Sequence, residues 1–191
     1  MPYLIAGLIL FLGLHSVRIF ADGWRSAQIA RFSDKGWKLL YTLVSLIGFG
    51  LILWGFHLAR QEPVVLWPRI HGMNHAAAAL MLLAFILLAA AYVPRNHLKA
   101  KLGHPMVLSV KTWAFAHLLA NNTLADVLLF GSFLVWAVLA YISLRRRDRA
   151  AGVLPREATT MGTVLTLIIG AVAFIAFAVW GHALLFGIQP L

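Results

Sequence analysis

The residues best suited to chemistry lie in segment 103–122, GHPMVLSVKTWAFAHLLANN, which carries His104, Lys111 and His117. The rest of the segment is mostly apolar, as in a helix that crosses a bilayer. An ionisable side chain in the hydrocarbon region is costly and usually marks a buried polar site. Neutral imidazole is a common ligand of metals and heme iron. A buried lysine without a partner is often neutral, so Lys111 is also a candidate proton donor or acceptor.

One helix cannot direct both of its histidines at the same ion. His104 and His117 differ by about 20 Å in height and about 140° around the helix axis, so each would need a partner on another helix. The expected depths favour His75 with His117 as an outer pair and His15 with His104 as a cytoplasmic pair. Asn121 follows His117 by one turn, so we expect its side chain to hydrogen-bond the imidazole and orient the ring.

Structural explanations compete with each of these assignments. His104 precedes Pro105, a favoured first helical residue, so it also fits a simple helix start. His71 and His75 have the spacing of a metal pair only if His71 is helical, and Gly72 argues against that. Other polar residues have ordinary explanations: His57 and His182 as interfacial side chains, His97 as a loop residue, and Asp126 with Thr123 as a capping box.

Composition makes the chain an integral membrane protein. It has 191 residues, of which 62% are hydrophobic and 12% charged, and its mean hydropathy is +0.86. A soluble domain of this size needs a more polar surface. The absence of cysteine excludes disulfides, thiolate catalysis, iron–sulfur clusters and zinc–cysteine sites. A metal or cofactor would therefore bind through histidine, methionine, carboxylate, amide or backbone groups.

The apolar runs predict an all-α bundle of about six transmembrane helices. The expected spans are 3–20, 36–58, 72–93, 104–120, 123–144 and 161–187, of which the fourth is the shortest. Thirteen lysines and arginines flank the first, third and fifth connections, whereas only Arg60 and Arg69 lie on the other side. The positive-inside rule then places both termini outside (N-out/C-out). These basic residues lie in short loops where they meet anionic lipid, so we expect no nucleic-acid partner.

Several segments together resemble the NnrU family of bacterial membrane proteins. These are LFLGLHSVRIF, GWKLLYTLVSLIGFGLILWG, AAYVP, GHPM, KTWAFAHLLAN and LADVLLFGSFLVWA. The resemblance is strongest over 1–147 and implies one membrane domain, 1–191, in which 161–187 is an additional helix. It also implies a multi-pass protein of the bacterial inner membrane. Such a protein would act in nitrite and nitric oxide metabolism, with nitrogen-oxide respiratory proteins as partners.

The NnrU family is in turn similar to the zeta-carotene isomerase, a membrane enzyme that contains heme b. The shared motifs are HSVR (His15, Ser16, Arg18), HPM (His104, Pro105) and WAFAH (Trp113, Ala116, His117). This resemblance implies a heme b with His15 and His117 as ligands. Together with the expected depths, it ranks His117 first as a ligand, then His15 and His75, with His104 last. Arg18 or Lys111 would pair with a propionate, and the substrate would be a hydrophobic polyene or isoprenoid. Ala114 stands at the position of the relative's cysteine, so ligation cannot alternate with a thiolate.

Two other functions remain open on sequence. A non-enzymatic accessory or assembly factor of the membrane would use its histidines structurally and bind no heme. The isoprenylcysteine-type methyltransferases, which use S-adenosylmethionine, also begin a late helix with His-Pro. They carry further binding residues after the last span, where this sequence has four residues, so we expect methyl transfer less.

Overall fold

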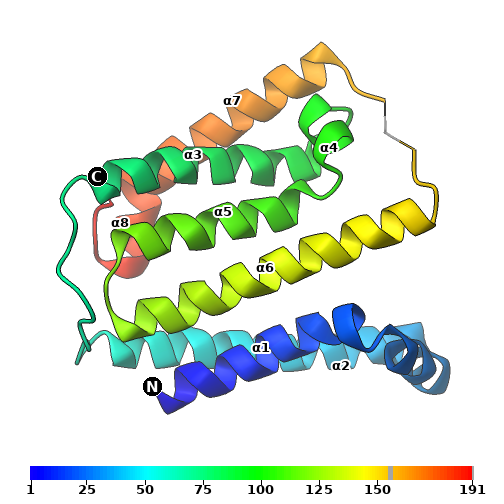
Figure 1. The fold of residues 1–191 in the computed structure, drawn as a ribbon, viewed down its shortest axis with the longest axis horizontal. Coiled ribbons are helices and arrows are strands. Elements are labelled where there is room, and N and C mark those ends of the chain that lie inside the picture. Colours follow the sequence, from blue (N-terminus) through cyan, green and yellow to red (C-terminus); the bar gives the residue numbers. More distant parts are fainter. Residues whose placement is uncertain (155–156, 191) are drawn as a thin grey trace. The chain divides into compact units, whose positions relative to one another are not determined.

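A computed structural model describes residues 1–154 and 157–190, so the predicted cytoplasmic Arg156 lies outside the described residues. The described residues form helices and loops, with one isolated β-bridge between Val65 and Thr123 (Figure 1). The prediction of an all-α fold is confirmed. The elements are α1 (Pro2–Phe20), α2 (Asp22–Ala59), α3 (Met73–Tyr92), α4 (His97–Leu102), α5 (Pro105–Ala120), α6 (Leu124–Ala150), α7 (Thr160–Ala176), the π-helix η1 (Phe177–Gly181) and α8 (His182–Phe186).

Each of the six predicted spans coincides with helix. Among the described residues, five helical stretches are long and apolar enough to cross a membrane, so the chain is a multi-pass membrane protein. The exception is α5, whose 16 residues rise about 24 Å, less than the roughly 30 Å of a hydrocarbon core. The last span is built from α7, η1 and α8 in succession. Which side of the membrane each end faces stays a prediction.

Helix α2 is longer than its predicted span because a second helical segment precedes it. Ser33 interrupts the helix with φ 66° and ψ 162°. The Ser33 hydroxyl accepts a hydrogen bond from the backbone N–H of Gly36 at 3.3 Å, and Asp34 lies in the following turn. A serine at the N-cap followed by an acidic residue is a favourable helix start. The membrane segment of α2 therefore begins close to the predicted residue 36.

The described chain forms two compact units, and α6 runs from one into the other. The first unit contains Met1–Pro68 and Asn122–Ala140. In it α1 packs along α2 at glycines that allow close backbone approach, as is common between membrane helices. A Cβ atom added to Gly7 would lie 2.6 Å from the backbone nitrogen of Ile52, and one added to Gly48 would lie 2.9 Å from that of Phe11.

A capping box begins α6 in the first unit, as the sequence predicts. The backbone N–H of Thr123 donates to the Asp126 carboxylate at 3.1 Å, and the backbone N–H of Asp126 donates to the Thr123 hydroxyl at 3.3 Å. The preceding turn is bound to the α2–α3 loop, because the Asn122 amide donates to the carbonyl of Trp67 at 2.6 Å.

The second unit contains Arg69–Asn121 and the chain from Tyr141 onward. Helix α3 lies between α5 and α7 (Figure 1). The Ser109 hydroxyl of α5 donates to the carbonyl of Ala84 at 2.7 Å, which sets the antiparallel register of the two helices. On the other side, a Cβ added to Gly170 of α7 would lie 2.6 Å from the Cα of Ile86.

Candidate functional site

His15 of α1 is the best-enclosed histidine of the first unit. Its Nδ1 lies 2.6 Å from the carbonyl oxygen of Phe11, one turn earlier. A carbonyl only accepts hydrogen bonds, so Nδ1 carries the proton and Nε2 is the nitrogen with the lone pair. The ring stacks on Phe11 at 4.1 Å between centroids, with Tyr41 of α2 at 5.2 Å and Trp136 of α6 at 6.1 Å. His15 therefore presents a ligand nitrogen among aromatic side chains.

Two buried polar atoms of the same unit have no hydrogen-bond partner among the described residues. They are the indole Nε1 of Trp136 and the hydroxyl of Ser45. Trp136 is an edge-on neighbour of His15, and Ser45 follows Tyr41 by one turn of α2. A buried polar group without a partner costs about 1–3 kcal/mol, so such atoms are candidates for contact with a bound molecule.

Arg18 lies one turn beyond His15 and faces the surface. Its Nε is 3.8 Å from a carboxylate oxygen of Asp22, and both side chains are more than half exposed. An ion pair this exposed contributes little to stability.

His117 of α5 shows the same local geometry in the second unit. Its Nδ1 lies 2.9 Å from the carbonyl oxygen of Trp113, which again leaves Nε2 as the nitrogen with the lone pair. The Trp113 ring is 5.4 Å from the imidazole, and His117 is half-buried. Asn121 does not contact the ring as predicted; its amide donates to the backbone carbonyl of His117 at 2.9 Å. The Trp113 carbonyl takes the orienting role that the sequence assigned to Asn121.

His75 does not face His117, although the α3–α5 register puts them at similar heights. Ala84 marks the side of α3 that contacts α5, because its carbonyl accepts from Ser109. His75 lies nine residues before Ala84, about 180° around the helix, and is exposed. His71 lies before the helix, since Gly72 has φ 82° and α3 starts at Met73. His71 and His75 therefore lack the helical spacing that a shared metal needs.

His104 has a carboxylate partner that the sequence did not reveal. Its Nε2 is 2.8 Å from a carboxylate oxygen of Asp148 near the end of α6, and each side chain is about a quarter exposed. The guanidinium of Arg145 lies 3.7 Å from the same oxygen, and the Tyr141 hydroxyl donates to the carbonyl of Leu102 at 3.1 Å. Because the carboxylate accepts from Nε2, His104 fits the role of a structural contact better than that of an iron ligand.

Lys111 is exposed on α5, and within the described residues it makes no ion pair. Asp126, at the start of α6, is buried and belongs to the capping box with Thr123. In residues 1–154 and 157–190, no group of three or more His, Asp or Glu side chains is placed to hold a metal ion. A heme iron needs only one or two imidazole ligands, so the search for groups of three or more side chains does not test heme binding.

A comparison with protein-family models finds one match, described as NnrU protein, over residues 3–190. The chain belongs to the NnrU family. The match covers nearly the whole chain, and it confirms the resemblance seen in the sequence. No curated protein and no solved structure matches the chain.

The geometry of this NnrU protein divides its predicted site histidines by chemistry. His15 and His117 each have Nδ1 bonded to the carbonyl four residues earlier, which fixes the ring and its tautomer. His104 has its Nε2 bonded to Asp148, and His75 is exposed at the start of α3. A neutral imidazole with an oriented Nε2 is the form that ligates heme iron. The first pair therefore has the donor chemistry of axial ligands.

Proposed function

We propose that this NnrU protein binds heme b through His117 of the second unit or His15 of the first, each a candidate iron ligand within its own unit. The observation that supports this most directly is the hydrogen bond that each imidazole makes from Nδ1 to a backbone carbonyl, at 2.9 Å and 2.6 Å respectively. A hydrogen bond to the ring nitrogen that does not bind the metal holds a ligand histidine in one tautomer and raises its basicity. With no cysteine in the chain, imidazole is the best iron ligand available.

The surroundings of the two imidazoles suit a porphyrin. Aromatic rings lie against both: Phe11, Tyr41 and Trp136 around His15, and Trp113 beside His117. Such rings pack on a flat apolar macrocycle and keep water away from it. Arg18 and Lys111 are the cations proposed to pair with propionates, since both are exposed and a charged hydrogen bond to a carboxylate is strong.

Bound heme would supply one-electron exchange and, where a single imidazole ligates the iron, a coordination position open to a small ligand or a double bond. The chain's part would be to hold the imidazoles neutral and oriented. Ala114, fully buried one residue after Trp113, offers no thiolate to exchange with an imidazole. We therefore propose a role in nitrite or nitric oxide metabolism at the bacterial inner membrane. The second candidate is isomerase-like action on a polyene or isoprenoid, as in the enzyme that the motifs resemble.

The test is the heme content of detergent-purified protein after expression with added heme precursor. We expect His117→Ala to lose most bound heme and His15→Ala to lower heme content or shift the Soret band. The control is His57→Ala, because His57 is an exposed residue of α2 whose ring bonds Gln61. Full heme content in both His117→Ala and His15→Ala would refute the proposal.

Adding nitric oxide or a cis-polyene to the reduced protein separates the two roles. A shift of the Soret band with nitric oxide, and no conversion of the polyene, supports the nitrogen-oxide role. Conversion of the cis-polyene to its trans isomer supports the isomerase-like role instead.

A further inference from the structure

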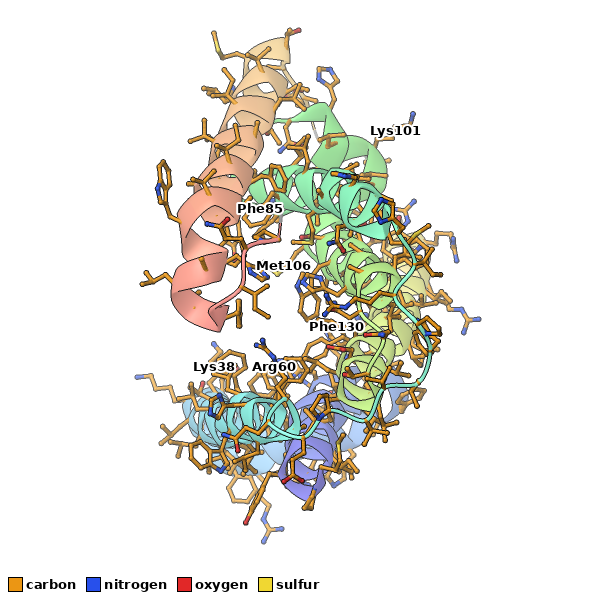
Figure 2. The ribbon with its side chains drawn as sticks, turned by 90° about the vertical axis from the view of Figure 1, so that its left-hand side faces the viewer. Lys38, Arg60, Phe85, Lys101, Met106 and Phe130 are labelled. Carbon is orange, nitrogen blue, oxygen red and sulfur yellow. The ribbon has the colours of Figure 1, made fainter. Side chains whose placement is uncertain are left out.

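An apolar groove runs along the contact of α3 and α7 in the second unit. It has a volume of about 530 Å³, within the range of small-molecule sites. The lining includes Phe85, Leu88, Tyr92, Pro94, Ile169 and Ala173. Phe85 points from α3 toward α7, where its ring meets that of Phe174 at 6.0 Å and that of Phe177 at 5.5 Å (Figure 2). Phe85 therefore places an aromatic ring at one end of the groove.

The length of the groove matches one leaflet of a bilayer. Along α3 it extends from Phe85 to Pro94, nine residues or about 14 Å. This is roughly half of a 30 Å hydrocarbon core. Pro94 ends the groove where α3 leaves the membrane, on the side predicted to be cytoplasmic. An acyl chain that enters at Pro94 would reach Phe85 near the middle of the bilayer.

Cations gather where the groove leaves the membrane. The basic corner consists of Arg95, Lys99 and Lys101, which follow the groove within seven residues of Pro94. Arg95 and Lys101 are exposed, and the Lys99 ammonium donates to the carbonyl of Ala91 in the last turn of α3. Glu157 lies two residues before Thr159, whose backbone bonds Arg95, and the Asp148 carboxylate near Gly103 is paired with Arg145. The three cations of the corner therefore keep a net positive charge.

The corner is joined to α7 by hydrogen bonds that fix its position beside the groove. The backbone N–H of Thr159 donates to the carbonyl of Arg95 at 2.7 Å, and the His97 ring bonds the Thr163 hydroxyl at 2.7 Å. Gly162 lies directly against the Arg95 carbonyl, where no side chain would fit. These contacts hold Arg95 beside Pro94, at the end of the groove.

We propose that this groove binds one acyl chain of an anionic phospholipid whose phosphate lies against the basic corner. The apolar lining accounts for the chain, and the net positive charge selects the anionic headgroup. Basic pockets between transmembrane helices on the cytoplasmic side suit anionic lipid headgroups. This site is independent of heme, because it contains neither His15 nor His117.

The test is native mass spectrometry of the purified protein in micelles with equal amounts of phosphatidylglycerol and phosphatidylcholine of identical acyl chains. We expect the wild type to retain phosphatidylglycerol at least about fivefold over phosphatidylcholine, roughly the effect of one cation near a charged membrane surface. Arg95→Asn should reduce that ratio about fivefold, because it removes one cation from the basic corner. Asparagine is chosen because it tolerates the φ of 49° at this position. The control for Arg95→Asn is Arg69→Asn, because Arg69 lies in a loop that is predicted on the opposite side of the membrane.

Filling the groove tests the acyl chain separately. Ala173→Phe should remove both lipids, whereas Val172→Phe, at an exposed neighbouring position, should leave binding unchanged. Equal retention of the two lipids by the wild type would overturn the proposal. Unchanged phosphatidylglycerol binding in Ala173→Phe would also overturn it, as would binding of soluble glycerol phosphate as tight as that of the lipid.

Discussion

The close packing of α1 on α2 predicts that Gly7→Ala destabilises the protein. A Cβ at residue 7 would lie 2.6 Å from the nitrogen of Ile52, 2.8 Å from the oxygen of Gly48 and 2.9 Å from the carbonyl carbon of Leu51. All three atoms are backbone of α2, so no side chain can rotate away. The nearest of them is about 0.8 Å closer than the 3.4 Å at which ordinary contact begins, so the helices must separate.

Gly13→Ala on the same helix supplies the matched control. A Cβ at residue 13 meets nothing within 4 Å. Alanine gains up to about 1 kcal/mol over glycine in a helix, and this gain applies at both positions. Subtracting the control removes the propensity term and leaves the cost of overpacking, about 1–3 kcal/mol. We therefore expect Gly7→Ala to be less stable than Gly13→Ala by about that amount.

The assay is reversible unfolding in mixed micelles of increasing sodium dodecyl sulfate, followed by tryptophan fluorescence. Three of the seven tryptophans, Trp24, Trp37 and Trp54, lie on α2 and report on this helix pair. Equal midpoints for the two alanine variants would refute the reasoning, because the close approach of the backbones would then carry no energetic cost.

Two further predictions concern contacts near the helix ends. Asp126→Ala should destabilise the protein by about 1 kcal/mol through loss of the capping box with Thr123, measured by the same unfolding assay. For the 2.8 Å contact between His104 and Asp148, a double-mutant cycle of His104→Ala and Asp148→Ala should give a coupling energy of about 0.5–1.5 kcal/mol at pH 6. A coupling energy indistinguishable from zero would show that the contact contributes nothing to stability.

Local and compositional features of the fold follow from the sequence because they depend on nearby residues. A run of about 20 apolar residues has few alternatives to a spanning helix, and all six predicted spans are helical. Thr123 and Asp126 are three positions apart, so the spacing of the capping box alone was sufficient to predict it. The extension of α2 before Ser33 was missed, since residues 22–32 carry too many polar side chains to read as a membrane span.

Contacts distant in sequence could not be predicted in the same way. Asp148 lies 44 residues from His104, within the run RRRDR that reads as a lipid anchor, and only the end of α6 brings them together. The expected heights alone suggested that His75 lies beside His117. Which side of α3 faces α5 depends on how the two helices pack, and α5 contacts the side of α3 opposite to His75. The role given to Asn121 went instead to the Trp113 carbonyl, because a backbone acceptor one turn earlier is already within reach of Nδ1.

The most direct measurement of the central claim is the optical spectrum of the purified wild-type protein, oxidised and then reduced with dithionite. If the oriented imidazole of His117 on α5 or of His15 on α1 ligates heme b, the oxidised protein has a Soret band that moves to longer wavelength on reduction. A pure, folded protein that stays colourless after expression with added heme precursor would contradict the account.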